Sequence, residues 1–414
     1  MDRKKILTGI VCVFFLSFHG VQGVQLSTQS SIKENGIVQN IKYNPDLELN
    51  VPQIIARHGY PSETHIVSTE DGYLLTLHRI SGSKNGTLGH TPVFLQHGLL
   101  GSSGDWIING NRSLGFVLAD AGYDVWLGNA RGNTYSKGHI SLSVKSPQFW
   151  NFSWHEMGTK DLPACFSYIM KKTNQQSLHY IGHSMGTTMF FVFASTMSDM
   201  AKHIKLMIAL APVANMTHIK SPIRYLAPFS YDIQWISKYI GLNQFLPSDK
   251  LLKFLAYDCE ILNIDKAVCE NILFVISGFD KKELNQDILP LIFTMLPAGT
   301  STKTVLHYAQ EIKNNGIFRK YDYGAEENLK IYGQTVPPKY NISNIKPEVY
   351  FMYGMNDWLA SYIDVEILAK NVPNLQGLYK VPMDSFNHID FIFGKDADTL
   401  IYQPILKLLG SPSL

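Results

Sequence analysis

The sequence predicts an α/β protein with a mostly parallel sheet, helices on both faces of the sheet, and an inserted helical segment. Short apolar segments alternate with segments of helical periodicity, the alternation stops at Pro212 and resumes at Pro347, and a glycine-flanked serine lies at one strand-to-helix junction. Nearly continuous apolar runs are typical of strands that are buried on both faces of a sheet. When helices connect such strands, the sheet is usually parallel. With 414 residues, 45% hydrophobic and 17% charged, the chain is not a disordered protein.

Residues 1–23 have the pattern of a cleaved secretory signal peptide. Three basic residues at positions 3–5 precede an apolar run from Ile6 to Phe18, and small residues follow near Gly23. An uncleaved anchor would need roughly 18–20 apolar residues, which is longer than this run. No later segment is long and apolar enough to suggest a second membrane span.

The charge balance argues against nucleic acid as a partner. Removing the signal segment, with its one acidic and three basic residues, lowers the formal net charge from +2 to zero. A neutral chain lacks the basic surface that phosphate backbones require. The 14 histidines are expected to make the protein strongly cationic at mildly acidic pH.

The remaining sequence fits an oxidising secretory compartment. After loss of the signal three cysteines remain, of which Cys259 and Cys269 are the expected disulfide, whereas Cys165 is expected to be a buried core residue and not a nucleophile. The C-terminus is not an ER-retention sequence, and no cysteine-histidine cluster has zinc-site spacing. Five Asn-X-Ser/Thr sites are expected glycosylation acceptors: Asn85, Asn111, Asn151, Asn215 and Asn341.

Along the chain, a hairpin over residues 64–80 is followed by alternating strands and helices. The expected later strands cover residues 92–96, 123–127, 178–181, 204–210, 348–353 and 377–381. The expected helices cover residues 112–121, 161–172, 185–199 and 396–409.

The interruption of about 135 residues is far longer than a normal connection between strands. Residues 215–340 are therefore predicted to form an inserted cap or lid over the carboxyl edge of the sheet, where α/β sheets bind ligands. Residues 24–214 and 341–414 then form the two parts of the core. The insertion is rich in large apolar side chains, namely Tyr225, Leu226, Phe229, Tyr231, Trp235, Ile236, Tyr239, Ile240, Phe245, Leu251, Leu252, Phe254 and Leu255.

The chemistry is expected at Ser184, in the G-x-S-x-G sequence Gly182–Gly186 between an apolar strand and a helix. A serine nucleophile needs a base and an orienting acid, and in this architecture the chain order is serine, acid, histidine. Asp357 and His388 satisfy that order, and each follows a strand on a loop. The competing residues His218, His307, Asp364 and Asp390 are expected to be solvated or capping groups.

Acyl transfer also needs hydrogen-bond donors for the oxyanion. The residue after the nucleophile supplies one backbone N–H, here that of Met185, and a loop after an early strand supplies the other. Leu99, in the loop that begins with His97 and Gly98, has that position.

These residues and others in the same order resemble those of the animal acid lipases, a family that includes gastric and lysosomal acid lipases and insect relatives. The resemblance extends from about Val51 to the C-terminal helix. The segments that carry it are 58–61, 70–75, 97–100, 128–136, 152–157, 161–164, 354–359 and 387–391.

The resemblance implies an α/β-hydrolase core with a helical cap, the catalytic residues Ser184, Asp357 and His388, and oxyanion donors at Leu99 and Met185. It implies hydrolysis of triacylglycerols or sterol esters at an oil–water or membrane interface, with no metal or organic cofactor. Vertebrate members usually have glutamine at the position of Met185 and a cysteine at the position of Ser277. We therefore expect an extracellular enzyme, as in a gut lumen, or a lysosomal one.

Two alternatives stay open at this point. A carboxylesterase acting on soluble esters would use the same three residues, and a non-catalytic lipid-binding or yolk-like protein could keep the fold without the activity. An inactive descendant would commonly have lost one of the three residues, and all three are present.

Overall fold

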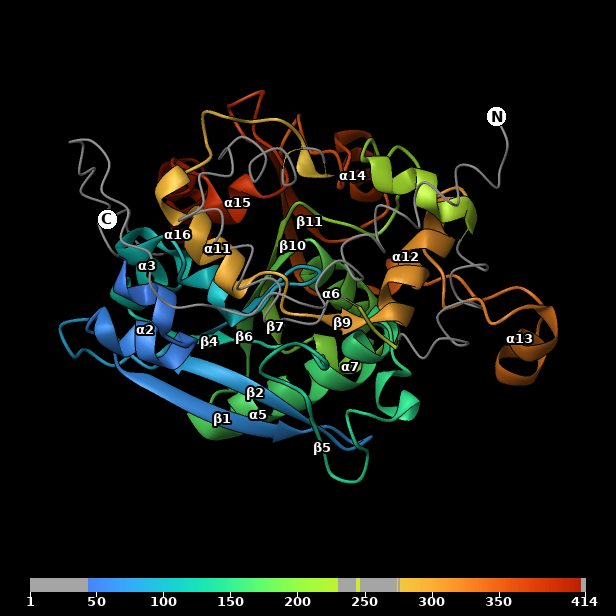
Figure 1. The fold of residues 1–414 in the computed structure, drawn as a ribbon, viewed down its shortest axis with the longest axis horizontal. Helices are drawn as coiled ribbons and strands as arrows, with labels where there is room; N and C mark the ends of the chain where they lie inside the picture. The colour runs from blue at the N-terminus through green and yellow to red at the C-terminus, as the bar shows by residue number, and fades with distance from the viewer. Residues whose placement is uncertain (1–43, 230–242, 246–273, 275, 411–414) are drawn as a thin grey trace, which may run out of the picture. The chain divides into compact units, whose positions relative to one another are not determined.

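The computed structural model describes residues 44–229, 243–245, 274 and 276–410 (Figure 1). The expected signal peptide, the two cysteines of the expected disulfide, and much of the apolar stretch between residues 231 and 255 lie outside this part of the chain. No helix in the described ranges is both long and apolar enough to cross a bilayer.

The main sheet runs in the order β1-β2-β4-β3-β6-β7-β10-β11, with β5 paired to β2. From β4 to β11 neighbouring strands are parallel, whereas β1, β2 and β5 are antiparallel additions at one edge. The strands are β1 (Ser62–Ser68), β2 (Tyr73–Ile80), β3 (Thr91–Gln96), β4 (Tyr123–Leu127), β5 (Gly138–His139), β6 (Leu178–His183), β7 (Ile204–Leu210), β10 (Glu348–Tyr353) and β11 (Leu375–Lys380).

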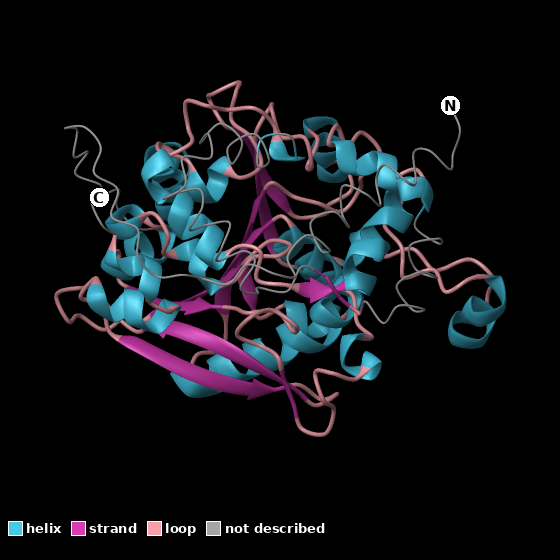
Figure 2. Cartoon of the chain, viewed as in Figure 1, coloured by secondary structure: helices cyan, strands magenta, loops and turns pink. Residues whose placement is uncertain are grey.

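Helices cover both faces of this sheet (Figure 2). α5 packs beside α6 on one face, and α3 packs against the turn that leads into α16 on the other. The helices of the core are α2 (Val51–Arg57), α3 (Leu114–Asp120), α4 (Trp154–Glu156), α5 (Leu162–Thr173), α6 (Met185–Thr196), α7 (Ser198–Ala201), α14 (Tyr362–Ala369), α15 (Asp390–Phe393) and α16 (Gln403–Leu408).

The predicted α/β architecture is confirmed, with every expected strand present. The expected helix over 185–199 is wrong in one respect, because Met197 (φ −125°, ψ 50°) leaves helical geometry and separates α6 from α7. α2 is not among the helices expected from the sequence, although its start is capped by Asn50 and Gln53 in a reciprocal capping box.

The described parts of the insertion form a short strand pair and several helices. They comprise a 3₁₀ helix (Pro222–Phe229), the short paired strands β8 (Gln244–Phe245) and β9 (Thr300–Ser301), α11 (Leu289–Met295), α12 (Thr302–Lys313) and α13 (Ala325–Tyr332). The hydroxyl of Tyr308 on α12 donates to Thr188 Oγ1 on α6 over 2.9 Å. The His307 ring stacks on Trp154 with ring centroids 3.5 Å apart.

The motif over residues 128–136 supplies a buried cation to the core. Arg131 is 1% exposed, and its guanidinium bonds Asp71 at 2.6 Å and Asp161 at 2.7 Å while lying 3.9 Å from the centre of the Tyr73 ring. A buried guanidinium is tolerated only when it is paired in this way. Arg131 therefore joins the β1–β2 turn to the start of α5.

Cys165 is buried and has a free thiol, as expected, and burial raises its pKa, which disfavours the thiolate. The expected glycosylation residues Asn85, Asn111, Asn151 and Asn341 are exposed, and Asn215 is half-buried.

Candidate active site

Ser184 lies on a sharp turn between β6 and α6, with φ 53° and ψ −116°. Such a backbone is strained for a residue with a Cβ, and strain of this kind is found at functional sites. The turn is fixed by a hydrogen bond from Ser184 N to Leu210 O on β7 (3.0 Å). A Cβ on Gly186 would lie 2.4 Å from Gln96 O, so only glycine lets the first turn of α6 approach β3.

The structure brings Ser184, Asp357 and His388 together in one hydrogen-bonded chain. His388 Nε2 lies 2.8 Å from Ser184 Oγ, and His388 Nδ1 lies 2.8 Å from Asp357 Oδ2. Asp357 and His388 are both buried, with exposed fractions of 1% and 4%. Because the carboxylate accepts the proton of Nδ1, the lone pair of Nε2 faces the serine hydroxyl.

The acid is held by its own loop. Asp357 follows β10, and its Oδ1 accepts hydrogen bonds from Leu359 N (2.9 Å) and Ala360 N (2.7 Å). These two backbone donors occupy one carboxylate oxygen and aim the other at His388. The position of Asp357 is therefore set by the turn that follows the strand.

The loop that carries the histidine is fastened by its neighbour Asn387. Asn387 Oδ1 accepts from Ile389 N (2.9 Å) and Asp390 N (3.2 Å), and Asp390 Oδ2 accepts from Asn387 N (2.7 Å). Asn387 Nδ2 also donates to Gly278 O in the insertion over 2.9 Å. Asn387 is not among the site residues expected from the sequence, although Asn-x-x-Asp before a helix is a recognisable capping pattern.

Two segments of the insertion bond the backbone of Trp358, the residue after Asp357. Trp358 O accepts from Lys220 N and Ser221 N, each over 2.9 Å, and Trp358 N donates to Ser277 O over 3.2 Å. At the next residue, Gly278, an added Cβ would lie 2.2 Å from Asn356 O. Two segments of the insertion are thus bonded to the loop that carries Asp357.

The two expected oxyanion residues lie beside the serine. Met185 begins α6, and Leu99 follows Gly98, whose added Cβ would lie only 3.2 Å from Ser184 Cβ. The next residue, Leu100, has φ 64°, and its carbonyl accepts a 2.7 Å hydrogen bond from Ala298 N of the insertion. The insertion therefore also holds the turn that contains Leu99.

The competing residues have other partners. Asp364 accepts from the backbone and ring of His218, each over 2.7 Å, and Asp390 caps the loop of Asn387 as expected. The His218 side chain is 41% exposed. The expectation of a solvated or capping group is wrong for His307 and for Asp364, because His307 is buried against Trp154 and Asp364 is 3% exposed in its pair with His218.

The expected cationic character in mild acid is also wrong for many histidines. Burial is the largest cause that lowers the pKa of seven of them: His65, His78, His97, His155, His179, His183 and His307. The pKa is about 4 for His78, His97 and His179. Burial keeps these last three side chains neutral in mild acid, and composition alone does not reveal which histidines are buried.

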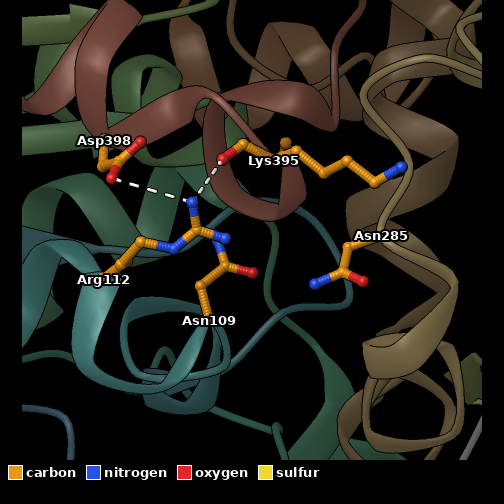
Figure 3. A pocket seen from close by; sticks show the side chains of 6 residues that line it. Asn109, Arg112, Asn285, Lys395 and Asp398 are labelled. Carbon is orange, nitrogen blue, oxygen red and sulfur yellow. Dashed lines mark hydrogen bonds and ion pairs between the residues drawn. The ribbon is translucent and has the colours of Figure 1, made fainter.

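A small surface pocket lies elsewhere, lined by Asn109, Arg112, Asn285, Gly394, Lys395 and Asp398 (Figure 3). Arg112 donates to Lys395 O over 3.1 Å and lies 3.9 Å from Asp398. None of the three active-site residues lines this pocket, so it is not the ester site.

Asp105, shortly after the Leu99 turn, links the stability of this region to pH. Burial raises the pKa of Asp105 to about 7. The pKa of an aspartate in the unfolded chain is about 3.9, so the unfolded chain loses this proton first as pH rises. The free energy of unfolding therefore falls by up to about 4 kcal/mol between about pH 4 and 7. We expect Asp105→Asn to gain stability relative to the wild type across that window.

The measurement is the melting temperature of both proteins from pH 4 to 7. The exposed Asp384 provides the control, since Asp384→Asn should leave the pH dependence unchanged. A difference between Asp105→Asn and the wild type that does not vary with pH would contradict the assignment.

Comparison with known families assigns the class first. A family model described as alpha/beta hydrolase fold matches residues 91–395, and one described as a partial alpha/beta-hydrolase lipase region matches residues 51–110. A candidate lipase structure from Sulfolobus solfataricus has a TM-score of 0.52 at 15% identity, covering 81% of this chain and 89% of that one. The molecule is an α/β-hydrolase.

Curated relatives narrow the assignment. Gastric triacylglycerol lipase of Bos taurus is 43% identical, covering 89% of this chain and 93% of the relative, and lysosomal acid lipase/cholesteryl ester hydrolase of Homo sapiens is 41% identical, covering 88% and 92%. Lipase lipl-5 of Caenorhabditis elegans is 40% identical, covering 88% and 93%. The chain belongs to the animal acid lipase family and is a carboxylic ester hydrolase.

Proposed function

We propose that the chain is a secreted or lysosomal lipase that hydrolyses triacylglycerols, sterol esters or both through an acyl-enzyme on Ser184. The observation that carries this proposal is the pair of 2.8 Å hydrogen bonds that join Ser184 to His388 and His388 to Asp357. The relatives named as gastric and lysosomal acid lipases support the substrate class and the secretory pathway.

In the first half of the reaction, Ser184 Oγ attacks the ester carbonyl carbon while His388 Nε2 accepts the hydroxyl proton. The backbone N–H groups of Leu99 and Met185 bind the oxyanion of the tetrahedral intermediate. When the intermediate collapses, the bond to the leaving oxygen breaks and His388 gives that oxygen the proton. An alcohol leaves, and the acyl group stays on Ser184.

In the second half, His388 Nε2 accepts a proton from water as the water oxygen attacks the acyl carbon. Collapse of the second intermediate releases the fatty acid and returns the proton to Ser184 Oγ. Asp357 stabilises the imidazolium in both halves and keeps the Nδ1 proton in place. No metal or organic cofactor is needed at any of these steps.

We further propose the organisation expected from the sequence. Residues 1–23 are removed, residues 24–214 and 341–414 form the core, and residues 215–340 form the cap. The Cys259–Cys269 disulfide would close a short loop in that cap, and the five asparagines would carry glycans. These assignments stay predictions.

Exposed apolar side chains near the acid support an insoluble substrate. Ile223 and Tyr225 are 36% and 70% exposed and follow the segment that bonds Trp358, while Ile276 and Phe279 are 40% and 46% exposed on the returning segment. The Phe279 ring lies 5.5 Å from the Trp358 ring. A group of exposed apolar side chains beside a site is suited to contact with a lipid surface.

We therefore expect hydrolysis of a triacylglycerol or cholesteryl ester to rise sharply once the substrate exceeds its solubility. The double variant Tyr225→Ser, Phe279→Ser should lower the rate on the emulsion by about 30-fold, because each apolar side chain contributes roughly 1 kcal/mol to adsorption. It should spare a soluble short-chain ester. The measurement is the initial rate against substrate concentration for both ester types.

Leu329→Ser is the matched control, because Leu329 is 53% exposed on α13, a segment with no described bond to the Asp357 or His388 loops. It should leave both rates unchanged. Equal loss on both esters in the double variant, or no preference for the emulsion in the wild type, would favour a carboxylesterase of soluble esters.

A further inference from the structure

His183 is the residue before the nucleophile and the last residue of β6. Its side chain is buried, with the whole residue 6% exposed, and its ring centroid lies 4.9 Å from that of His388 at an interplanar angle of 44°. The reaction described above gives it no part. A second histidine packed directly against the base nevertheless lies where it can affect that base.

The contact between the two histidines includes a hydrogen bond to the main chain. His183 Nε2 lies 2.9 Å from the carbonyl oxygen of His388. A carbonyl oxygen only accepts, so Nε2 of His183 carries the proton and donates it. This bond runs directly from the strand that carries the nucleophile to the backbone of the residue that carries the base.

The ring of His183 also contacts the oxyanion turn. A Cβ on Gly98 would lie 3.1 Å from His183 Nδ1, so the absence of a side chain there makes room for the ring. His183 thus fills the space between the turn that precedes Leu99 and the loop that carries His388. Three parts of the active site meet on one side chain.

His183 keeps this role in acid. Burial, with the nearby His388 as the next cause, lowers the pKa of His183 to about 3. The groups that face its ring are His388, Phe391 and, more distantly, His97, and burial also keeps His97 neutral in mild acid. His183 therefore adds no positive charge beside the imidazolium that forms on His388.

Other bonds to this loop act on different groups. Asp357 holds the His388 ring. The side chain of Asn387, the residue before His388, donates to Gly278 O of the insertion. The bond from His183 restrains the His388 carbonyl itself and so limits how far the imidazole can move from Ser184 Oγ. Apart from the bond between Ser184 Oγ and His388 Nε2, no other hydrogen bond described above joins the nucleophile and its strand to the residue that carries the base.

We propose that His183 is a positioning residue for the hydrolysis, whose Nε2–H holds the His388 backbone at the distance from which the imidazole reaches Ser184. This inference rests on the proposed triad. Its effect is expected in kcat and not in KM, because His183 aligns the base and does not contact the bound ester.

The test compares His183→Leu, which has no donor, with His183→Gln, whose Nε2 can reach the same carbonyl. On a soluble short-chain ester we expect His183→Leu to lower kcat by about 10- to 100-fold, with KM within about twofold. His183→Gln should stay within about threefold of the wild-type kcat. His183→Asn keeps an amide of shorter reach and should lower kcat as much as His183→Leu does. The asparagine variant therefore keeps the proposal testable if the leucine variant fails to fold.

His179 provides a matched control at the other end of the same strand. It is half-buried, and burial lowers its pKa to about 4, but it pairs with Val93, far along β6 from the serine. His179→Leu should leave kcat unchanged. Equal losses in the Gln and Leu variants at position 183, or unchanged kcat in the Leu variant, would overturn the proposal.

Labelling with a fluorophosphonate and mapping of the labelled peptide separates this proposal from the triad itself. The wild type should be labelled at Ser184, and His183→Leu should be labelled at the same residue about 10- to 100-fold more slowly. Absence of label at Ser184 in the wild type would contradict the triad. Label at Ser184 with equal rates in both proteins would contradict only the role of His183.

Discussion

Replacing Ser184 by alanine is expected to lower kcat by about 10⁵- to 10⁶-fold on any ester. The Oγ atom forms the acyl-enzyme, and no other nucleophile in the described part of the chain donates a hydrogen bond to His388 Nε2 in its place. The measurement is the hydrolysis rate of a soluble ester by purified protein, with circular dichroism as the check on folding.

Ser195 on α6 offers the control for this experiment. It is buried, and its hydroxyl donates to Val192 O over 3.1 Å within the same helix. Ser195→Ala removes an equivalent atom from the helix that Ser184 precedes and should keep activity near the wild-type level. Substantial hydrolysis by Ser184→Ala would show that another group is the nucleophile.

The second large effect is expected for Asp357→Asn, with a loss on the order of 10⁴ in kcat. The backbone N–H groups of Leu359 and Ala360 both donate to Oδ1, so an asparagine would keep its oxygen there and turn its NH₂ toward His388. An NH₂ group cannot accept from Nδ1–H, so the imidazole would carry its proton on Nε2. It could then no longer accept the proton of Ser184.

Asp364→Asn is the comparison for the second experiment. Asp364 is also buried and also bonds a histidine, but that histidine is His218. Its replacement should affect stability more than turnover. If Asp364→Asn lowered kcat more than Asp357→Asn did, the orienting acid would have been assigned to the wrong residue.

The fold and the three central residues could be predicted because each depends on local pattern. Ser184, Asp357 and His388 all follow apolar strands, and the carboxyl ends of parallel strands share one edge of a sheet. A serine between glycines at a strand-to-helix junction adds the required backbone conformation. Sequence order and strand ends were therefore enough to bring these three residues together.

The surroundings of the site could not be predicted in the same way. The bonds that hold Trp358 and Leu100 use backbone groups of the insertion, and a backbone N–H or carbonyl leaves no residue type for a pattern to detect. The role of His183 depends on contact with a residue more than two hundred positions away. The wrong expectation for His307 has the same origin, since burial arises from packing between distant segments.

The bonds between the returning segment of the insertion and the core have a consequence for protein engineering. Ser277, Gly278 and Phe279 bond the loops of Asp357 and His388, Glu283 O accepts from Lys395 N, and Ala298 N bonds the turn of Leu99. A chimera that exchanged the whole of residues 215–340 with another lipase would replace these partners of all three catalytic loops. An exchange limited to residues 222–276 would keep them, so a chimera of that kind is expected to retain the turnover number of the recipient.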